Sequence, residues 1–422
     1  MEHLVITGQK QLSGEVFISG AKNAVVAIIP AAIMAKGKCV IENLPVIEDV
    51  RSLVDTLTNI GAVCEFTDDN SLVIDSSNIN KYCATYESVK KIRASYYLMG
   101  ALLGRFKKAE VAMPGGCNFG TRPIDQHLRG FKALGAEYTI QHGVVKLSAE
   151  KLTGSHIYLD MPSVGATINI MLAAAMAEGV TLIENAAKEP HIVDTANFLN
   201  MLGAKVKGAG TDVIKITGVS ELHGAEYMII PDQIEAGTYM IAAAMAGGDV
   251  TVRNIIPKHM DPLSAKLQEM GCMLYEGDDF IRVVSTGNLV PTTVKTMVYP
   301  GFPTDLQPQM TALLCVANGT SILTENVWDN RFQYINELKR LGGNITVEGR
   351  VAVVEGVKQL MGAEVNATDL RAGAALVIAG LAAKGTTTIG NVKYIDRGYE
   401  KIEEKLTAIG ADVKRVADKN ES

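Results

Sequence analysis

The segment PGGCNFGTRPIDQHL, residues 114–128, brings together residue types that suit acid or nucleophilic chemistry. Its glycines make the backbone permissive, so we predict a loop with the Cys117 thiol near its tip. Arg122 follows five residues later, and a cation that folds back on a thiol lowers the pKa of that thiol and favours the reactive thiolate. The alternative is an incidental surface cysteine beside a turn, and composition alone leaves both interpretations open.

The other five cysteines form no recognisable metal-binding or disulfide pattern. The chain has no CxxC pair and no paired histidine spacing, which is typical of reduced thiols in a cytosolic protein. We expect four of them to be inert because they lie in apolar or strand-like settings: Cys39, Cys64, Cys272 and Cys315. Cys83 suggests no role. The sequence shows no motif for a metal ion or an organic cofactor, so we expect neither.

The composition is that of a globular protein. The chain has 422 residues, of which 47% are hydrophobic and 20% charged, and this length predicts two domains. A net charge of −6 argues against a nucleic-acid or anionic-membrane surface, although a small anionic substrate needs only a few basic residues. The first residues show no basic segment followed by an apolar run, so we expect no signal peptide and a cytoplasmic protein. The apolar stretches 24–35 and 372–383 have twelve residues each, fewer than the about 18–20 of a membrane span, and predict buried helices.

A sixfold repeat organises the whole chain. Its signature is an apolar residue, a glycine, usually an alanine, and then a strand-like run, as in ALGAEYTI or AIGADVKR. The six glycines are spaced by 68 to 74 residues: Gly61, Gly135, Gly203, Gly271, Gly342 and Gly410. A solenoid array is the alternative, but this period is longer than the usual 20–50 residues of solenoids.

The repeats predict an α/β fold of an unusual kind. Each contains an Ala-rich segment that is apolar nearly all round and therefore predicts a buried helix, followed by a strand; residues 165–185 are an example. Strands near the ends of the repeats, such as VAVVEG, tend to alternate and suggest sheets with one wet face. We therefore predict two inside-out α/β domains, each of three repeats of about 70 residues, with a seam near 229–237.

Polar residues occur at matching points near the start of each inner helix. Free N–H groups and a partial positive charge at a helix N-terminus attract phosphate and carboxylate. If the two domains face each other with these ends inward, the cleft between them becomes an anion site. The residues are Lys22, Asn23, Arg93, Gly165, Thr167, Glu235, Asp305, Asp369 and Arg371.

Five segments together resemble one enzyme family. PGGCNFGTRPIDQH, SGAKNA, SVGAT, GFPTDLQPQ and IDRGYE occur in the same order as in UDP-N-acetylglucosamine 1-carboxyvinyltransferases, the enolpyruvyl transferases of the first committed step of peptidoglycan synthesis. The similarity runs essentially from end to end. The family's two inside-out domains agree with the repeat. The resemblance further implies that residues 1–20 join the C-terminal half, giving domains 21–230 and 1–20 plus 231–422 with the active site in the cleft between them.

The resemblance implies two small-molecule substrates, phosphoenolpyruvate and UDP-N-acetylglucosamine, and no cofactor, nucleic acid or membrane partner. Lys22, Asn23, Arg122 and Arg397 match residues that hold phosphoenolpyruvate, and arginine's fork suits both its phosphate and its carboxylate. Arg331 and Arg371 are candidates to support the same site. The positions that match the nucleotide-sugar site are Asn23, Arg93, Arg122, Pro123, Ile124, Asp125, Gln126, Ser163, Val164, Gly165, Asp305 and Val327. Met161 stands where many relatives carry a lysine, so we leave it out of the site.

The family's reaction is addition followed by elimination, and the resemblance gives catalytic roles to Cys117, Asp305, Lys22 and Arg397. Cys117 would deliver the proton to C3 of phosphoenolpyruvate, attach to it reversibly, and be alkylated by the epoxide antibiotic fosfomycin. Asp305 is the candidate base for the sugar 3′-hydroxyl. A carboxylate surrounded by cations is a weak base, so we expect Asp305 mainly to orient that hydroxyl.

Two alternatives remain for the function. The 3-phosphoshikimate enolpyruvyl transferase shares the fold and the donor but lacks the PGGCNFGTRP loop, which argues against it. A non-catalytic paralogue built on the same repeats is the other. The presence of Lys22, Cys117, Asp305 and Arg397 argues against this second alternative.

Overall fold

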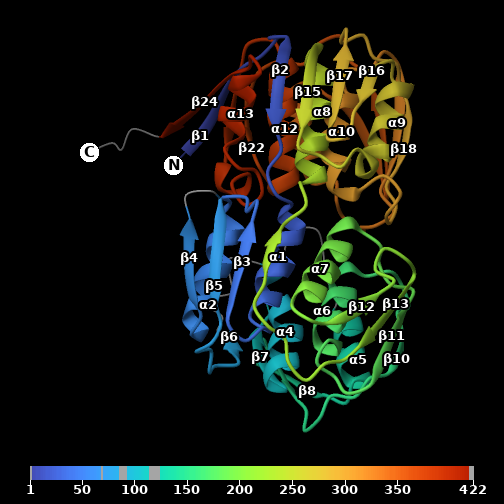
Figure 1. Cartoon of the computed structure of the whole chain (residues 1–422). Helices are drawn as coiled ribbons and strands as arrows, with labels where there is room; N and C mark the ends of the chain where they lie inside the picture. The colour runs from blue at the N-terminus through green and yellow to red at the C-terminus, as the bar shows by residue number, and fades with distance from the viewer. Residues whose placement is uncertain (1, 68–69, 85–92, 114–123, 418–422) are drawn as a thin grey trace. The chain divides into compact units, whose positions relative to one another are not determined.

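The computed structural model describes residues 2–67, 70–84, 93–113 and 124–417. These form two compact units, and each is treated by itself. Unit 1 takes in the residues up to Ser19 and those from Pro231 onward, and unit 2 the described residues between Gly20 and Ile230. Figure 1 shows helices and strands alternating along the chain in both units.

Each repeat builds one four-stranded sheet around one inner helix. In the third repeat, a short strand pairs in parallel with the strand that follows the inner helix. That second strand also pairs antiparallel with one strand of the hairpin that ends the repeat. The sheet order is β10-β11-β13-β12. The elements are β10 His156–Tyr158, the inner helix α6 Val164–Ala174, β11 Val180–Glu184, the outer helix α7 Pro190–Met201, β12 Lys205–Lys207 and β13 Val213–Thr217.

The other two repeats of unit 2 follow the same plan. The first has α1 Lys22–Ala32, β3 Lys38–Glu42, α2 Glu48–Ile60, β4 Val63–Thr67 and β5 Ser71–Asp75, and its fourth strand, β14 Glu226–Met228, comes from the end of the unit. The second has β6 Cys83–Ala84, a 3₁₀ turn Arg93–Tyr96, α4 Tyr97–Phe106, β7 Lys108–Ala112, α5 Asp125–Ala133, β8 Glu137–Gln141 and β9 Val144–Ser148. Because β14 returns to β3, the three repeats close on themselves, and the open solenoid alternative is wrong.

Unit 1 contains the last three repeats and the N-terminal strands. The fourth repeat has α8 Gln233–Ala246, β15 Gly248–Arg253, α9 Asp261–Glu269, β16 Met273–Glu276 and β17 Phe280–Ser285. The fifth has β18 Thr293–Lys295, α10 Gln307–Leu314, β19 Thr320–Thr324, α11 Ile335–Arg340, β20 Asn344–Glu348 and β21 Val351–Glu355. The sixth has β22 Glu364–Asn366, α12 Leu370–Ala382, β23 Thr386–Gly390, α13 Ile402–Ala408 and β24 Asp412–Ala417.

The N-terminal strands complete two sheets of unit 1. β1 (Glu2–Thr7) lies between β23 and β24 and is antiparallel to both, and β2 (Leu12–Phe17) pairs in parallel with β15. In the fourth repeat, the strand that pairs in parallel with the one after the inner helix is therefore β2, from the start of the chain.

The helices predicted to be inner ones are buried, as expected for an inside-out α/β fold. Every residue of α6 except Val164 is buried, and α12 is buried from Leu370 to Leu381. Small residues let these helices approach closely: a Cβ on Gly100 of α4 would lie 2.4 Å from the backbone oxygen of Asn169 on α6. The Gly100 amide also donates to the Asn169 side chain at 2.8 Å. The sheets of each unit surround its inner helices, which confirms the predicted fold class (Figure 1).

The repeat glycines have a common backbone requirement. All six adopt positive φ, between 92° and 109°, where L side chains are strained. Each allows the chain to turn from an outer helix into the following strand, which explains why an apolar residue followed by glycine recurs at this point in every repeat.

A second repeated device lies at the end of the strand after the inner helix. In four repeats the next residue is an asparagine with φ between 54° and 59°: Asn43, Asn185, Asn254 and Asn391. Each side-chain amide donates to a backbone oxygen just beyond the parallel neighbouring strand, at Ile229, Leu159, Ile18 and Ala367 respectively. These asparagines therefore fasten each sheet at the same corner.

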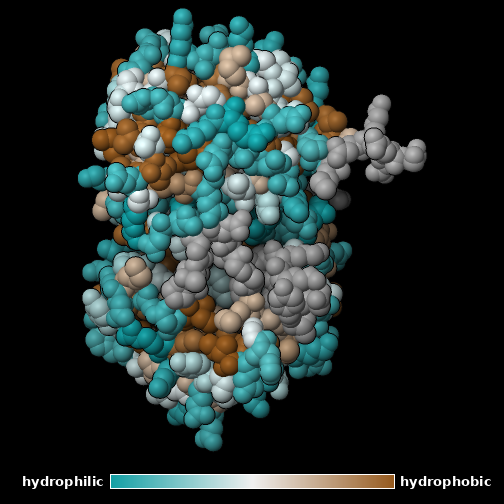
Figure 2. Space-filling view, turned by 180° about the vertical axis from the view of Figure 1, so that it is seen from behind, coloured by the Kyte–Doolittle hydropathy of each residue, from teal (hydrophilic) through white to brown (hydrophobic). Residues whose placement is uncertain are grey.

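The surface seen in Figure 2 is mainly hydrophilic, with apolar side chains in separate areas. Large exposed apolar residues include Phe17, Met161 and Met228. Within the described part of the chain, no helix has the length and hydropathy that a membrane crossing requires.

We predict that Gly342→Ala destabilises the protein by about 1–2 kcal/mol, because the added Cβ meets backbone strain at φ 92° but no neighbouring atom within 4 Å. Gly342→Asn should cost less, because asparagine tolerates the left-handed region. The measurement is the shift of the urea unfolding midpoint. Equal losses in the two variants would contradict a backbone cause.

Candidate active site

Asp305 is held between two arginines of unit 1. It lies in the 3₁₀ turn Thr304–Leu306, directly before α10. Arg331 Nη2 donates to Asp305 Oδ1 at 3.0 Å, and Arg371 Nη2 donates to Oδ2 at 3.2 Å. The side chains of Arg331 and Arg371 are 3% and 4% exposed, whereas that of Asp305 is 29% exposed. Two buried cations thus present one partly accessible carboxylate.

The charge on Arg371 is stabilised despite its burial. Burial alone lowers the pKa of Arg371, but the nearby charge of Asp305, together with Tyr399 and Asp232, outweighs this effect, and the pKa of Arg371 is raised. Asp305 consequently faces an Arg371 guanidinium group that keeps its charge.

Tyr399 links this pair to the segment that carries Arg397. Its hydroxyl accepts from Gln309 Nε2 at 3.1 Å and from Arg371 Nη1 at 3.4 Å, and it lies 2.8 Å from the Thr238 hydroxyl. Burial raises the pKa of Tyr399, so the phenol keeps its proton. The backbone two residues before it, at the half-buried Arg397, is therefore anchored to the site of Asp305.

The same segment is fixed on its other sides. Asp396 accepts from Arg415 at 2.7 and 3.0 Å. Glu400 accepts from the Ser19 hydroxyl at 2.6 Å. Lys405 donates to Ser19 Oγ at 2.8 Å and to the buried Glu235 at 2.5 Å. These contacts hold the segment around Arg397 through its neighbours.

Three inner-helix N-termini are capped by their own side chains. Asp232 accepts from two amides of the first turn of α8, Asp369 from two of α12, and Ser163 from the Ala166 amide of α6. Carboxylates of the chain thus accept hydrogen bonds from the first turns of α8 and α12. Near the start of α10, Arg331 and Arg371 supply positive charge beside Asp305.

Helix α1 of unit 2 differs, because no side chain caps its N-terminus. Lys22 and Asn23 are its first two residues. Lys22 Nζ lies 3.2 Å from Asp49 Oδ2, and the two side chains are 15% and 3% exposed. The buried Asp49 holds the Lys22 ammonium group near the first turn of this helix. The ammonium group and the N–H groups of that turn can together attract an anion.

The start of α6 packs against a buried histidine. His127 Nδ1 lies 2.9 Å from Asn169 Nδ2, and burial lowers the pKa of His127 to about 4, so the ring is neutral. A Cβ on Gly165 would lie 2.9 Å from the His127 ring, so only glycine fits there. This contact sets the place of Ser163 and Val164 relative to α5.

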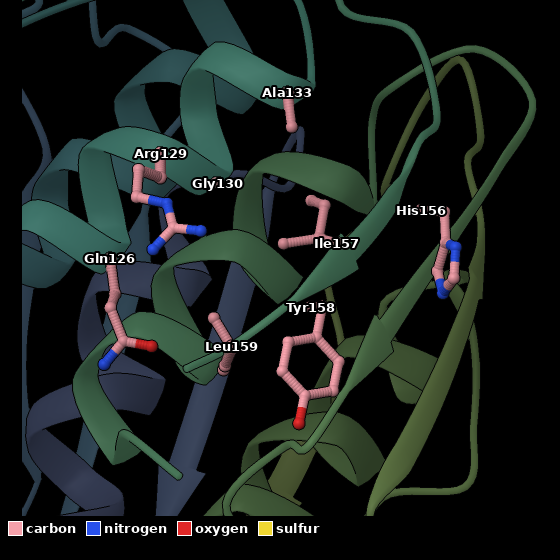
Figure 3. Close-up of a pocket in the computed structure, with 8 residues that line it drawn as sticks. All are labelled: Gln126, Arg129, Gly130, Ala133, His156, Ile157, Tyr158 and Leu159. Carbon is pink, nitrogen blue, oxygen red and sulfur yellow. The ribbon is translucent and has the colours of Figure 1, made fainter. Parts of the chain in front are cut away.

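Gln126 lines a pocket of about 170 Å³ between α5 and β10. Figure 3 shows Gln126 and Arg129 projecting from the helix, with the Gln126 amide pointing toward Leu159. Gln126 Oε1 is buried and has no hydrogen-bond partner within the described residues. Arg129 forms an ion pair with Asp160, next to the exposed Met161.

The predicted site residues are therefore distributed between the two units. Unit 2 holds Lys22, Asn23, Ile124 to Gln126 and Ser163 to Gly165, and unit 1 holds Asp305, Val327 and Arg397. Cys117, Arg122 and Pro123 lie outside the described residues, as does the side chain of Arg93. The structure brings Asp305 together with Arg331 and Arg371. Among described residues, no cluster of three His, Cys, Asp or Glu side chains is placed to hold a metal ion.

Sequence reasoning missed Tyr399, Asp49 and His127. Asp49 is a buried polar residue whose partner Lys22 is distant in sequence, so no local spacing marked it. His127 lies inside the PGGCNFGTRPIDQH segment, and that segment was the available signal. Tyr399 lies inside the IDRGYE segment, and that segment was the available signal.

The five described cysteines are free thiols with raised pKa values. Burial raises the pKa of Cys64 to about 11 and that of Cys315 to about 12, and it also raises those of Cys39 and Cys272. For the exposed Cys83, burial and Glu110 raise the pKa. These thiols hold their protons near neutral pH and are poor nucleophiles.

Comparison with known proteins identifies the class. Residues 6–406 match the family model of EPSP synthase (3-phosphoshikimate 1-carboxyvinyltransferase), which together with the repeated fold defines an enolpyruvyl transferase. The UDP-N-acetylglucosamine 1-carboxyvinyltransferase of Clostridium botulinum is 57% identical over 99% of this chain and 100% of that protein. UDP-N-acetylglucosamine 1-carboxyvinyltransferase 2 of Bacillus subtilis is 55% identical over 98% and 97%. The chain belongs to the UDP-N-acetylglucosamine 1-carboxyvinyltransferase family.

Solved structures agree on the fold. The enolpyruvyl transferase NikO from Streptomyces tendae has a TM-score of 0.89 with 28% identity, covering 98% of both chains. EPSP synthase from Acinetobacter baumannii has a TM-score of 0.75 with 19% identity, over 99% of this chain and 100% of that one, and this likeness shows the fold alone.

We predict that Asp305→Asn destabilises unit 1, because it removes the negative charge that two buried guanidinium groups share. Breaking a buried pair costs about 3–5 kcal/mol, and the 29% exposure of Asp305 places the loss at or below the lower end. The matched control is Asp249→Asn, which removes the same charge from an exposed pair with Arg282. The melting temperature should fall much more for Asp305→Asn than for Asp249→Asn. Equal decreases would contradict the conclusion that Asp305 is the shared partner of two buried arginines.

Proposed function

We propose that the chain transfers the enolpyruvyl group of phosphoenolpyruvate to the 3′-hydroxyl of UDP-N-acetylglucosamine, releases phosphate, and thereby begins peptidoglycan synthesis. The observation that carries the proposal is the 53–57% identity, over nearly full length, to relatives named for this activity. The fork of Asp305, Arg331 and Arg371 supports it independently.

The fork suits orientation of the acceptor. Each Asp305 oxygen accepts a guanidinium N–H, and a carboxylate oxygen can accept more than one hydrogen bond, so a substrate hydroxyl can also donate to it. Two cations favour the ionised carboxylate, so it takes up a proton poorly. Asp305 therefore accepts a hydrogen bond from the sugar hydroxyl and aligns its oxygen with C2 of phosphoenolpyruvate, rather than acting as a strong base. Val327, together with Asn23, Arg93 and the segments 122–126 and 163–165, would bind the rest of the nucleotide sugar.

Cations from both units would hold the donor. Phosphoenolpyruvate carries a phosphate and a carboxylate, and Lys22, Arg122 and Arg397 supply ammonium and guanidinium groups for them. Lys22 is held by Asp49 at 3.2 Å, and Arg397 lies between the anchored residues Asp396 and Tyr399. Because these residues belong to different units, binding the donor requires both.

The acid role is assigned to Cys117. As the sugar oxygen bonds to C2, its hydroxyl proton passes to the phosphate group and Cys117 gives a proton to C3. The C2–O bond to phosphate then breaks, Cys117 takes a proton back from C3, and the enol ether forms while phosphate leaves with the hydroxyl proton. A thiol can give and take back this proton near neutral pH. The resemblance assigns this role to Cys117, and the raised pKa values of the five described cysteines make them unsuited to it.

We also propose a cytoplasmic location with phosphoenolpyruvate and UDP-N-acetylglucosamine as small-molecule partners. The free described thiols are typical of a reducing compartment. The net charge of −6 disfavours nucleic acid and anionic membranes as partners.

The proposal is tested by incubating the protein with phosphoenolpyruvate and UDP-N-acetylglucosamine and following phosphate release. We expect turnover with this acceptor and none with shikimate 3-phosphate. Release only with shikimate 3-phosphate would favour the related transferase. Release with neither acceptor would favour a non-catalytic paralogue.

Fosfomycin should inactivate the enzyme by alkylating Cys117. Mass spectrometry is expected to find one adduct per chain, on Cys117, with the five described cysteines unmodified. Cys117→Asp should retain an acid but form no adduct. Covalent inactivation of Cys117→Asp would show that the thiol is not the target.

A further inference from the structure

Glu325 is a buried carboxylate that no proposed role has used. It follows β19 and is 1% exposed. Its Oε1 accepts from Thr296 Oγ1 at 2.8 Å and from the backbone amides of Val327 and Trp328 at 2.8 and 3.1 Å. Its Oε2 accepts from Thr304 Oγ1 at 2.8 Å. Four donors thus meet one side chain and fix its orientation.

The repeats show that this carboxylate is a departure from the common plan. Position 325 directly follows the strand after the inner helix, where four other repeats place Asn43, Asn185, Asn254 or Asn391 with positive φ. Those asparagines donate to a backbone oxygen just beyond the neighbouring strand. Glu325 donates nothing there, has no positive φ, and accepts from the Thr296 side chain of the corresponding segment. In the fifth repeat, the buried acceptor Glu325 therefore stands where four other repeats have an asparagine that donates a hydrogen bond to the neighbouring segment.

The two oxygens of Glu325 lead to two parts of the candidate site. On the Oε1 side, the carboxylate shapes the turn that contains Val327. On the Oε2 side, the Thr304 hydroxyl donates a hydrogen bond to Glu325. The same hydroxyl oxygen accepts a hydrogen bond from Arg331 Nη1 at 3.0 Å. Arg331 in turn donates through Nη2 to Asp305. A chain of hydrogen bonds therefore runs from the Val327 turn to the Asp305 carboxylate.

We propose that Glu325 is a positioning residue that fixes the turn containing Val327 and the Asp305 carboxylate relative to each other. It acts through Val327 on binding of the acceptor and through Thr304 and Arg331 on alignment of its hydroxyl. This inference rests on the proposed function, because it assigns Glu325 to the acceptor side of that reaction.

The test compares steady-state kinetics of three variants. Glu325→Gln keeps the size of the side chain but replaces one acceptor oxygen with a donor, so it cannot accept all four hydrogen bonds. It should lower kcat by about 10- to 100-fold and raise the KM for UDP-N-acetylglucosamine. Thr304→Val breaks only the Oε2 branch, so it should lower kcat with little change in that KM. The matched control is Glu269→Gln, which alters another Thr–Glu hydrogen bond of unit 1, to Thr292, and should leave both constants unchanged.

A double-variant experiment separates positioning from simple support of the fold. In an Asp305→Asn background, Glu325→Gln should cause little further loss of kcat, because the aligned group is already altered. Thr304→Val gives the same test if Glu325→Gln does not fold. Losses that multiply in the Asp305→Asn background, or wild-type constants in Glu325→Gln, would overturn the inference. Failure of the unmodified protein to release phosphate would count against the proposed function instead.

Discussion

The ion pairing of Asp305 with Arg331 and Arg371 is the interaction on which the rest of the site depends. Two buried guanidinium groups need a counter-charge, and the one they share is a carboxylate that stays partly accessible. Their other N–H groups reach Thr304 and Tyr399, so the fork is tied to Glu325 on one side and to the Arg397 segment on the other. A carboxylate held in this way is fixed in direction and in charge, which suits orientation of a hydroxyl better than removal of its proton.

The repeated scaffold explains how such a cluster can be built. Closely packed helices of small residues form a rigid interior, a glycine with positive φ turns the chain in every repeat, and an asparagine with positive φ fastens the sheet in four of them. The residues of the fork and its neighbours come from the fourth, fifth and sixth repeats, where inner helices converge. At Glu325 the fifth repeat gives up its fastening asparagine and gains an acceptor for the site. Stability comes from what the repeats share, and the chemistry comes from where one of them differs.

Much of this architecture was predictable, because it rests on local patterns. The six repeat glycines predicted the length of the repeat, and all of them adopt positive φ in the structure. The Ala-rich segments predicted the buried helices. The charged network was not predictable from spacing, since Thr238, Gln309, Arg371 and Tyr399 meet only through tertiary packing. The placement of β1 between β23 and β24 likewise depends on contacts almost four hundred residues apart. The capping of α8 and α12 by Asp232 and Asp369 was also not predicted, and the expectation that helix N-termini receive anions stays a prediction.

The central claim is that Asp305 orients the acceptor hydroxyl while both arginines hold it. A crystal structure of the protein with UDP-N-acetylglucosamine bound tests this most directly. The account predicts the sugar 3′-hydroxyl oxygen at about 2.7 Å from an Asp305 carboxylate oxygen, with the Arg331 and Arg371 contacts retained. A 3′-hydroxyl bound to another residue, or an Asp305 side chain turned away from either arginine, would contradict it.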